Sequence, residues 1–186
     1  MRFNRHLELK DKHAFLSPSS YHWINYDEQK LEARYTASQA ARRGDDLHKL
    51  AHNAITLGVK FAASNQALAT YVNDAINYKM SSEQVLFYSD HCFGTADSIC
   101  FRRNKLRIHD LKTGIVKTSE KQLEVYAALF CLEYEVSPYD ISIELRIYQR
   151  DEVRVFHPYS ETIDSIMRII VDHNRHIEEI RRQQNL

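Results

Sequence analysis

The heptapeptide IHDLKTG, residues 108–114, places a carboxylate and an ammonium group two positions apart in apolar surroundings. The composition of the segment favours a strand, and side chains in a strand alternate between its two faces. Asp110 and Lys112 therefore point to one face, and Leu111 points to the other. Such a pair suits either a plain ion pair at a sheet edge or a site that binds a cation.

A second carboxylate precedes this pair in the chain. Asp97 lies in the otherwise apolar segment GTADSI, and the short turn RRNKL predicts that the two segments are antiparallel neighbours. The carboxylates of Asp97 and Asp110 would then lie close together on one face, where they repel each other unless a cation separates them. Lys112 can be that cation by itself. Alternatively, the two carboxylates and the Leu111 carbonyl bind Mg²⁺ or Mn²⁺, which favour oxygen ligands.

The metal alternative points to hydrolysis of a phosphodiester. Magnesium takes one or two carboxylates together with water and substrate phosphate. Lys112 would orient the attacking water and offset the negative charge that develops in the transition state. Gln122 and Tyr126 lie four residues apart in an expected helix, so they share one helix face and can bind phosphate or position the lysine. Tyr126 is equally compatible with a place in the core.

Basic residues are concentrated around these carboxylates, although the 186-residue chain has a formal net charge of zero. The cluster consists of Arg102, Arg103, Lys105, Arg107, Lys112, Lys117 and Lys121. A local basic surface beside a metal site suits a polyanion such as DNA. The candidate DNA contacts are Arg102, Arg103, Lys105, Lys117 and Lys121. A solvated basic hairpin is the alternative interpretation.

These side chains need a scaffold, and the hydrophobic pattern predicts an α/β domain in which helices flank a central mixed sheet. Helical spacing extends over about 32–57, 66–78, 119–134 and 160–183, and a further helix is expected to start in 16–24, capped by Ser17 or Ser19. Strands are predicted at about 83–90, 94–103, 105–113, 139–150 and 153–158. A single domain is expected, helical over 1–80 and with the catalytic sheet and its helices in 81–186.

Five short motifs occur in the order of a known family. GTAD, HDLKTG and QLEVY resemble the GxxD strand, the DxK strand and the QxxxY helix of the PD-(D/E)XK nucleases, in the RecB-family and lambda-exonuclease-like branch. LSPSSYHWI resembles the N-terminal SxS helix of that branch, and RRGDDLHKLAH resembles its helical G-x-x-x-H motif. The resemblance spans about Leu16 to Tyr134 and implies a restriction-endonuclease-like core.

Carried over position by position, the resemblance implies a metal site. His48, Asp97 and Asp110 would bind the ion, and the Leu111 carbonyl would complete the set. A histidine on a helix face is otherwise most often a core or surface residue, and the G-x-x-x-H spacing favours the ligand role here. Glu83 corresponds to a position that is often acidic in this branch and is expected to support the ligands from behind.

The resemblance also implies an activity. Lys112 would be the catalytic lysine, assisted by Gln122 and Tyr126, in a magnesium- or manganese-dependent deoxyribonuclease that acts as an exonuclease in recombination, repair or phage DNA metabolism. DNA is the expected partner, and a single-strand annealing protein is a further partner that the resemblance suggests. The alternative is a DNA-binding or assembly module that keeps the nuclease fold without cutting. The oligomeric state stays open.

The cysteines and the ends of the chain bear on cofactors and location. Cys92, Cys100 and Cys131 show no CxxC spacing, so no iron–sulfur cluster is expected, and two of them suit small core positions. The charged start of the chain does not read as a signal peptide, and no stretch approaches the ~20 apolar residues that span a membrane. We expect a cytoplasmic protein, in the host cytoplasm if a phage encodes it.

Overall fold

Five strands form one sheet in the order β1–β2–β3–β4–β5. They are β1 (Ser81–Ser89), β2 (Cys92–Arg102), β3 (Lys105–Lys112), β4 (Ser142–Gln149) and β5 (Glu152–Phe156). The β3–β4 pair is parallel and the other pairs are antiparallel. The predicted mixed sheet is therefore confirmed, including the meander of its first three strands and the final hairpin.

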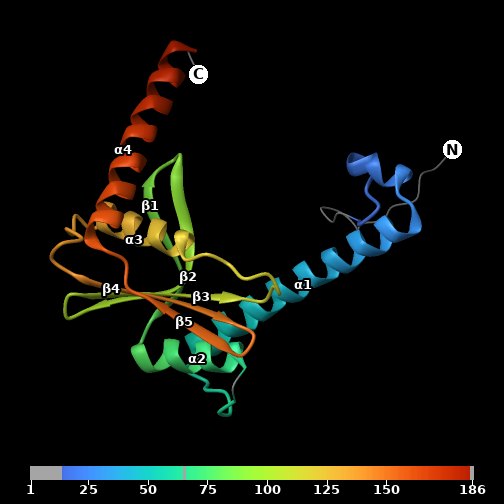
Figure 1. Ribbon diagram of the computed structural model, residues 1–186, viewed down its shortest axis with the longest axis horizontal. Coiled ribbons are helices and arrows are strands. Elements are labelled where there is room, and N and C mark those ends of the chain that lie inside the picture. The colour runs from blue at the N-terminus through green and yellow to red at the C-terminus, as the bar shows by residue number, and fades with distance from the viewer. Residues whose placement is uncertain (1–13, 65, 185–186) are drawn as a thin grey trace, which may run out of the picture. The chain divides into compact units, whose positions relative to one another are not determined.

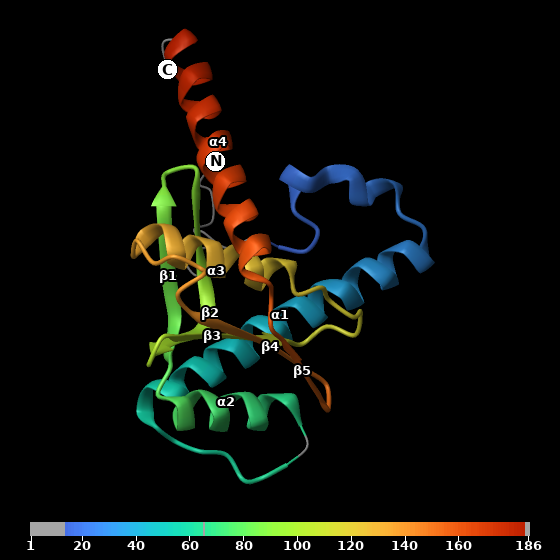
Figure 2. The ribbon, with the colours of Figure 1, turned by 60° about the vertical axis from the view of Figure 1, so that its left-hand side comes forward.

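Helices cover both faces of this sheet (Figures 1 and 2). One face carries α3 (Lys121–Glu133), which connects the parallel strands β3 and β4, and α4 (Ser160–Gln183). The other face carries α2 (Ala67–Tyr78), which contacts β3 and β4. Each face has its own apolar cluster, because alternate strand residues such as Ile108 and Leu111 pack on opposite sides. The predicted α/β class is confirmed.

The computed structural model describes residues 14–64 and 66–184. They fall into two compact units, one ending at Asp45 and the other starting at Asp46, so the boundary lies within α1 (Glu28–Leu57). The second unit contains the sheet and every candidate site residue. Within it, Ala51, Ala54 and Ile55 of α1 pack in the same apolar cluster as α2.

The first unit contains the 3-10 helix η2 (Pro18–Asn25) and the first part of α1. The predicted helix start is in the right place, but the predicted cap is wrong. Ser17 occupies the N-cap position, yet no side-chain capping bond is present among the described residues, since its Oγ lies 2.8 Å from the Oγ of Ser19. The Ser17 carbonyl instead accepts a hydrogen bond from Trp23 Nε1 at 2.9 Å.

The sheet forks between β2 and β3. The two strands pair from Arg102 opposite Lys105 as far as Ser98 opposite His109, and beyond that point β2 pairs only with β1. The β1–β2 hairpin rises from the plane of the other strands toward the side of α3 (Figures 1 and 2). The next residues along each strand, Asp97 and Asp110, therefore lie where the ladder opens.

A partly buried polar network fixes α2 to the sheet on the other face. Tyr148 on β4 donates a hydrogen bond to Asp74 Oδ2 at 2.7 Å, and Arg146 Nη1 donates to the same oxygen at 3.0 Å. His109 on β3 is fully buried, and its Nδ1 lies 3.1 Å from the Tyr148 hydroxyl. Because the Tyr148 proton is given to Asp74, the Nδ1 of His109 is the donor in that contact.

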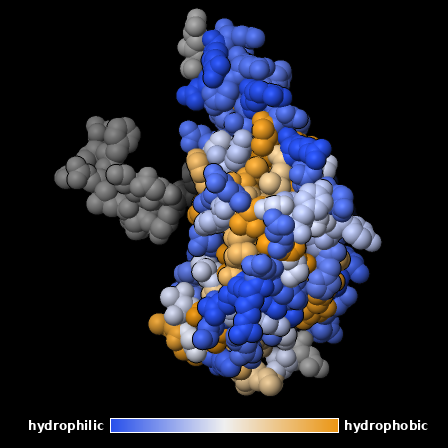
Figure 3. All heavy atoms as spheres, turned by 90° about the vertical axis from the view of Figure 1, so that its left-hand side faces the viewer, coloured by the Kyte–Doolittle hydropathy of each residue, from blue (hydrophilic) through white to orange (hydrophobic). Residues whose placement is uncertain are grey.

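Hydrophilic and apolar side chains are unevenly distributed over the surface of the second unit (Figure 3). Figure 3 shows hydrophilic side chains over the far end of α4 and scattered apolar ones on the body of the second unit. No helix within 14–64 and 66–184 has both the length and the apolar character to cross a membrane. Cys100 and Cys131 are buried, as expected for small core residues, and Cys92 is partly exposed.

Candidate active site

Asp97 bridges the fork of the sheet. Its Oδ2 accepts a hydrogen bond from the backbone N–H of Leu111 on β3 at 2.9 Å. The same oxygen lies 3.5 Å from Nδ1 of His48, which comes from the second half of α1. The side chain of Asp97 is 18% exposed and that of His48 is 31% exposed, so the group is reachable from solvent. The predicted proximity of His48 and Asp97 is present in the structure.

The Leu111 carbonyl faces the same opening. In a strand, the N–H and C=O of one residue point toward the same neighbouring strand. The N–H of Leu111 points to Asp97 on β2, so its carbonyl also points to the β2 side. Because β2 leaves β3 at this point, the Leu111 carbonyl is oriented as a backbone metal ligand would have to be.

Glu83 lies in the group itself. One ligand atom from each of His48, Glu83 and Asp97 lies within 4.8 Å of the other two. Ser82 on β1 pairs with Ser98 on β2, and Gln84 pairs with Ala96. Glu83, between these two residues, therefore lies opposite Asp97. Its φ of +54° is left-handed, a conformation that costs free energy for a non-glycine residue within a strand. Glu83, expected to support the ligands from behind, thus lies close enough to His48 and Asp97 to be a candidate ligand itself.

Asp110 is a buried carboxylate next to this group. It is 3% exposed, and its Oδ1 accepts a hydrogen bond from Lys112 Nζ at 3.0 Å. Its Oδ2 is buried and has no hydrogen-bond partner among the residues that the structure describes. Burial raises the pKa of Asp110, against the lowering effect of Lys112. One oxygen of this carboxylate is thus available to a cation.

The environment of Asp97 disfavours its ionised form. Burial and then the charge of Asp110 raise the pKa of Asp97 to about 6, although the Leu111 N–H and the charges of His48 and Lys112 act to lower it. Two carboxylates held together in a desolvated site favour a bound cation. The grouped donors of His48, Glu83 and Asp97 fit a divalent ion such as Mg²⁺ or Mn²⁺. Asp110, predicted as a ligand, is not one of these three grouped residues, although its orphaned oxygen could serve the same cation.

A chain of hydrogen bonds holds Lys112. Its Nζ donates to Asp110 Oδ1 and, at 2.9 Å, to Gln122 Oε1 on α3. Gln122 Nε2 donates to the Tyr126 hydroxyl at 3.3 Å, and that hydroxyl donates to the Thr95 carbonyl on β2 at 2.7 Å. The residues predicted to assist the lysine therefore contact it directly or through one another.

His52 and Ser82, which were not predicted as site residues, help to position Asp97. His52, one helical turn after His48, has its Nδ1 3.1 Å from Ser82 Oγ. Ser82 Oγ in turn donates to the backbone carbonyl of Asp97 at 3.2 Å. This contact ties α1 to the strand residue that precedes Glu83. The helical spacing of the two histidines is the sequence signal that could have indicated it.

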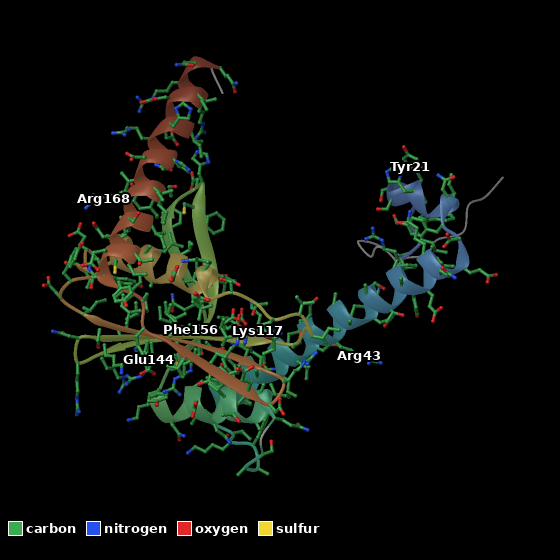
Figure 4. All side chains as sticks on the ribbon, in the orientation of Figure 1. Tyr21, Arg43, Lys117, Glu144, Phe156 and Arg168 are labelled. Atoms are coloured by element: carbon green, nitrogen blue, oxygen red, sulfur yellow. The ribbon has the colours of Figure 1, made fainter. Side chains whose placement is uncertain are left out.

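The structure divides the predicted DNA contacts between the two ends of β3. Lys117 and Lys121 follow the end of β3 that carries Lys112, while the group at its start comprises Arg102, Arg103 and Lys105. Glu144 on β4 lies near the start of β3 and Lys117 beyond its end (Figure 4). One continuous basic patch is thus replaced by two.

Comparison with models of known protein families found no match, and comparison with curated proteins found none either.

Proposed function

We propose that this protein is a metal-dependent DNA nuclease of the PD-(D/E)XK type that hydrolyses phosphodiester bonds and acts as an exonuclease. One observation carries the proposal. At the fork of the sheet, a lysine held against one buried carboxylate lies beside a second carboxylate that is grouped with a histidine and a glutamate. A plain ion pair between Lys112 and Asp110 would leave the His48–Glu83–Asp97 group and the orphaned Asp110 oxygen unexplained.

The metal would be held by the grouped donors of His48, Glu83 and Asp97. The partnerless oxygen of Asp110 and the Leu111 carbonyl, which points to the β2 side, would complete the set. When bound, a divalent cation supplies Lewis-acid stabilisation of phosphoryl oxygens and lowers the pKa of a coordinated water. The Leu111 N–H fixes the Asp97 carboxylate, so the donor set is oriented before an ion arrives.

Lys112 supplies a fixed positive charge next to this donor set. Its ammonium is held between Asp110 and Gln122, so it needs little reorganisation as negative charge develops on the phosphate. The third N–H of the ammonium can orient the attacking water or a phosphate oxygen. Gln122 and Tyr126 act as positioning residues, because they reach the lysine by hydrogen bonds.

The two lysines after β3 offer a route for the DNA backbone. Lys117 is exposed in the loop that follows Lys112, and Lys121 opens α3. Lys121 also pairs with Glu124 at 2.8 Å, so Lys117 is the stronger candidate for a phosphate contact near the cleaved bond. Action in recombination, repair or phage DNA metabolism belongs to this proposal through the resemblance, as does a single-strand annealing partner.

The experiment compares end-labelled linear DNA with covalently closed circular DNA in Mg²⁺, in Mn²⁺ and in EDTA. Metal-dependent degradation of linear DNA with intact circles is the expected result. The variants are Asp110→Asn and Lys112→Ala, and the matched control is Asp140→Asn, which removes an exposed carboxylate from the loop before β4.

Each outcome decides between the candidates. Loss of cleavage in Asp110→Asn and Lys112→Ala, with parent-like activity in Asp140→Asn, supports the nuclease. Cutting of closed circles would make the enzyme an endonuclease. DNA binding without any metal-dependent product in the parent would reject the nuclease in favour of a binding or assembly module that keeps the fold.

A further inference from the structure

A polar pocket of about 430 Å³ lies at the turn between β2 and β3, at the end of β3 remote from Lys112. This volume is in the range of small-ligand sites. Five of its described lining residues are basic and none is acidic. The basic residues are Lys79, Arg102, Arg103, Lys105 and Arg107.

The charge of this pocket is only partly balanced by the protein. Glu144, which lies beside the pocket, accepts contacts from Lys105 Nζ at 2.7 Å and Arg107 Nε at 3.2 Å. Lys79, Arg102 and Arg103 make no ion pair within the part of the chain that the structure describes. An excess of positive charge therefore remains in the pocket, and such an excess attracts anions.

At two of these positions the backbone conformation does not favour a basic residue. Lys79 ends α2 with a φ of +55°, and Arg103 lies in the two-residue hairpin turn with a φ of +51°. Glycine or asparagine is favoured in this left-handed region, and α1 indeed ends at Gly58 with a φ of +68°. Long basic side chains are placed here despite a conformational cost, which points to a role for the charges themselves.

The aromatic residue of the pocket favours recognition of phosphate over recognition of a base. The guanidinium groups of Arg107 and Arg146 lie over the Tyr78 ring, 4.6 and 5.1 Å from its centroid. Tyr78 also accepts a hydrogen bond from Arg146 Nη2 at 3.0 Å. The ring is engaged by the protein's own cations, so the pocket offers charge and N–H donors instead of a stacking surface.

The pocket and the candidate active site lie on opposite faces of the sheet. Arg107 points toward Tyr78 on α2, whereas Lys112 points toward Gln122 on α3. Along the strand, the seven residue steps of β3 from Lys105 to Lys112 separate the two ends by ~23 Å. This length corresponds to about seven base pairs of duplex at ~3.4 Å each.

We propose that this pocket binds backbone phosphates of the DNA substrate at a distance of about seven base pairs or more from the cleaved bond. The proposal rests on the proposed function for the identity of the polyanion. The pocket would hold the uncut part of the substrate, in an interaction that reads charge and not sequence. It would raise the affinity for long DNA without taking part in hydrolysis.

The experiment measures binding in EDTA, where metal-dependent cleavage does not occur, so its result does not depend on nuclease activity. Fluorescence anisotropy with a labelled duplex of about 30 base pairs is recorded over a salt series for the parent and for Arg102→Ala/Arg103→Ala. The matched control, Arg168→Ala/Arg175→Ala, removes the same charge from exposed positions on α4. We expect about tenfold weaker binding for the pocket variant and a salt slope reduced by about two, because about one counterion is released for each phosphate contact.

Length dependence provides a second readout. A hairpin with a stem of about six base pairs is too short to occupy the active site and the pocket together, so Arg102→Ala/Arg103→Ala should weaken its binding less than that of the 30-base-pair duplex. Parent-like affinity and salt slope in Arg102→Ala/Arg103→Ala would overturn the proposal, as would an equal loss in the α4 control. Binding of pyrophosphate that requires Arg102 and Arg103, combined with unchanged DNA affinity, would also overturn it by assigning the pocket to a small phosphate compound.

Discussion

Gly94 on β2 lies against the ring of Tyr126 on α3, so closely that a Cβ on Gly94 would be 3.0 Å from Tyr126 Cε1. The absence of a side chain at this position lets the Tyr126 hydroxyl reach the Thr95 carbonyl. From there the hydrogen bonds continue through Gln122 to Lys112. The glycine of GTAD and the tyrosine of QLEVY are thus two sides of one contact that positions the lysine.

Replacement of this glycine should disturb the lysine without unfolding the protein. In Gly94→Ala the added methyl group displaces the Tyr126 ring by a few tenths of an ångström and weakens the hydrogen bonds beyond it. We expect about tenfold slower DNA cleavage, because small misplacements of catalytic groups lower the reaction rate strongly. We also expect a loss of roughly 1 kcal/mol in the free energy of unfolding. Gly114→Ala is the control, since no described atom lies within 4 Å of its added Cβ. Parent-like cleavage by Gly94→Ala would contradict this account of the contact.

Lys112 should contribute more to the rate of DNA cleavage than its amide partner Gln122. Lys112→Ala removes the fixed charge, and we expect cleavage to fall by roughly 10²–10³-fold, as for loss of a group that stabilises transition-state charge. Gln122→Ala leaves the Asp110 contact in place, so a loss of about tenfold is expected, with little change in DNA affinity. Single-turnover rates at saturating DNA separate these effects. Equal losses in the two variants would mean that Gln122 contacts the substrate directly.

Much of the fold could be predicted from the sequence because its signals are local. The predicted strand at 105–113 corresponds to β3 at Lys105–Lys112, and the predicted final helix has the observed bounds Ser160–Gln183. Hydrophobic periodicity and turn residues specify such elements directly. The electrostatic effect of Asp110 on Asp97 was also predictable, since a short turn makes their strands neighbours.

Other features of the structure depend on geometry that no local sequence pattern carries. Glu83 reaches His48 and Asp97 through its left-handed backbone and the register of β1 on β2. Glu144 looks like an ordinary strand residue, yet cations from β3 and β4 converge on it. The basic residues seemed to form one cluster because they are near in sequence, whereas the length of β3 separates them in space.

Glu144 should make stability sensitive to acid. Burial acts to raise its pKa, but the hydrogen bond from Lys105 and two neighbouring guanidinium groups lower the pKa to about 2. A carboxyl whose folded-state pKa lies below its unfolded value stabilises the fold above the unfolded pKa. That contribution, up to about 3 kcal/mol, is lost as the pH falls from about 4.5 toward 2.

Urea unfolding across this pH range tests the role of Glu144. In Glu144→Gln we expect a lower free energy of unfolding at pH 7 and a weaker decline below pH 4.5, because the carboxylate that links three cations is gone. Glu152→Gln, which changes an exposed carboxylate on β5, should behave like the parent. If Glu144→Gln kept the full acid-dependent decline, the decline would belong to other carboxylates.

Asp97 should have the opposite effect on the metal-free protein. Burial and the charge of Asp110 raise its pKa from 3.8 to about 6, so the folded state binds more protons than the unfolded state in this range. Stability of the metal-free protein is therefore expected to fall as the pH rises from about 4 to 6, and to stay reduced above that. Asp97→Asn removes the charge while its amide oxygen can still accept the Leu111 N–H.

In EDTA at about pH 7.5, Asp97→Asn should thus melt several degrees above the parent. The reason is that a pKa shift of this size corresponds to about 2–3 kcal/mol in the free energy of unfolding. Addition of Mg²⁺ or Mn²⁺ should reverse the order, because an ion that binds only the folded state stabilises the parent and finds fewer ligands in the variant. Cleavage should be lost in the same variant. If metal-free Asp97→Asn melted below the parent, the ionised carboxylate would be needed to hold the fork of the sheet together. Repulsion between Asp97 and Asp110 would then not be the reason for a cation to bind there.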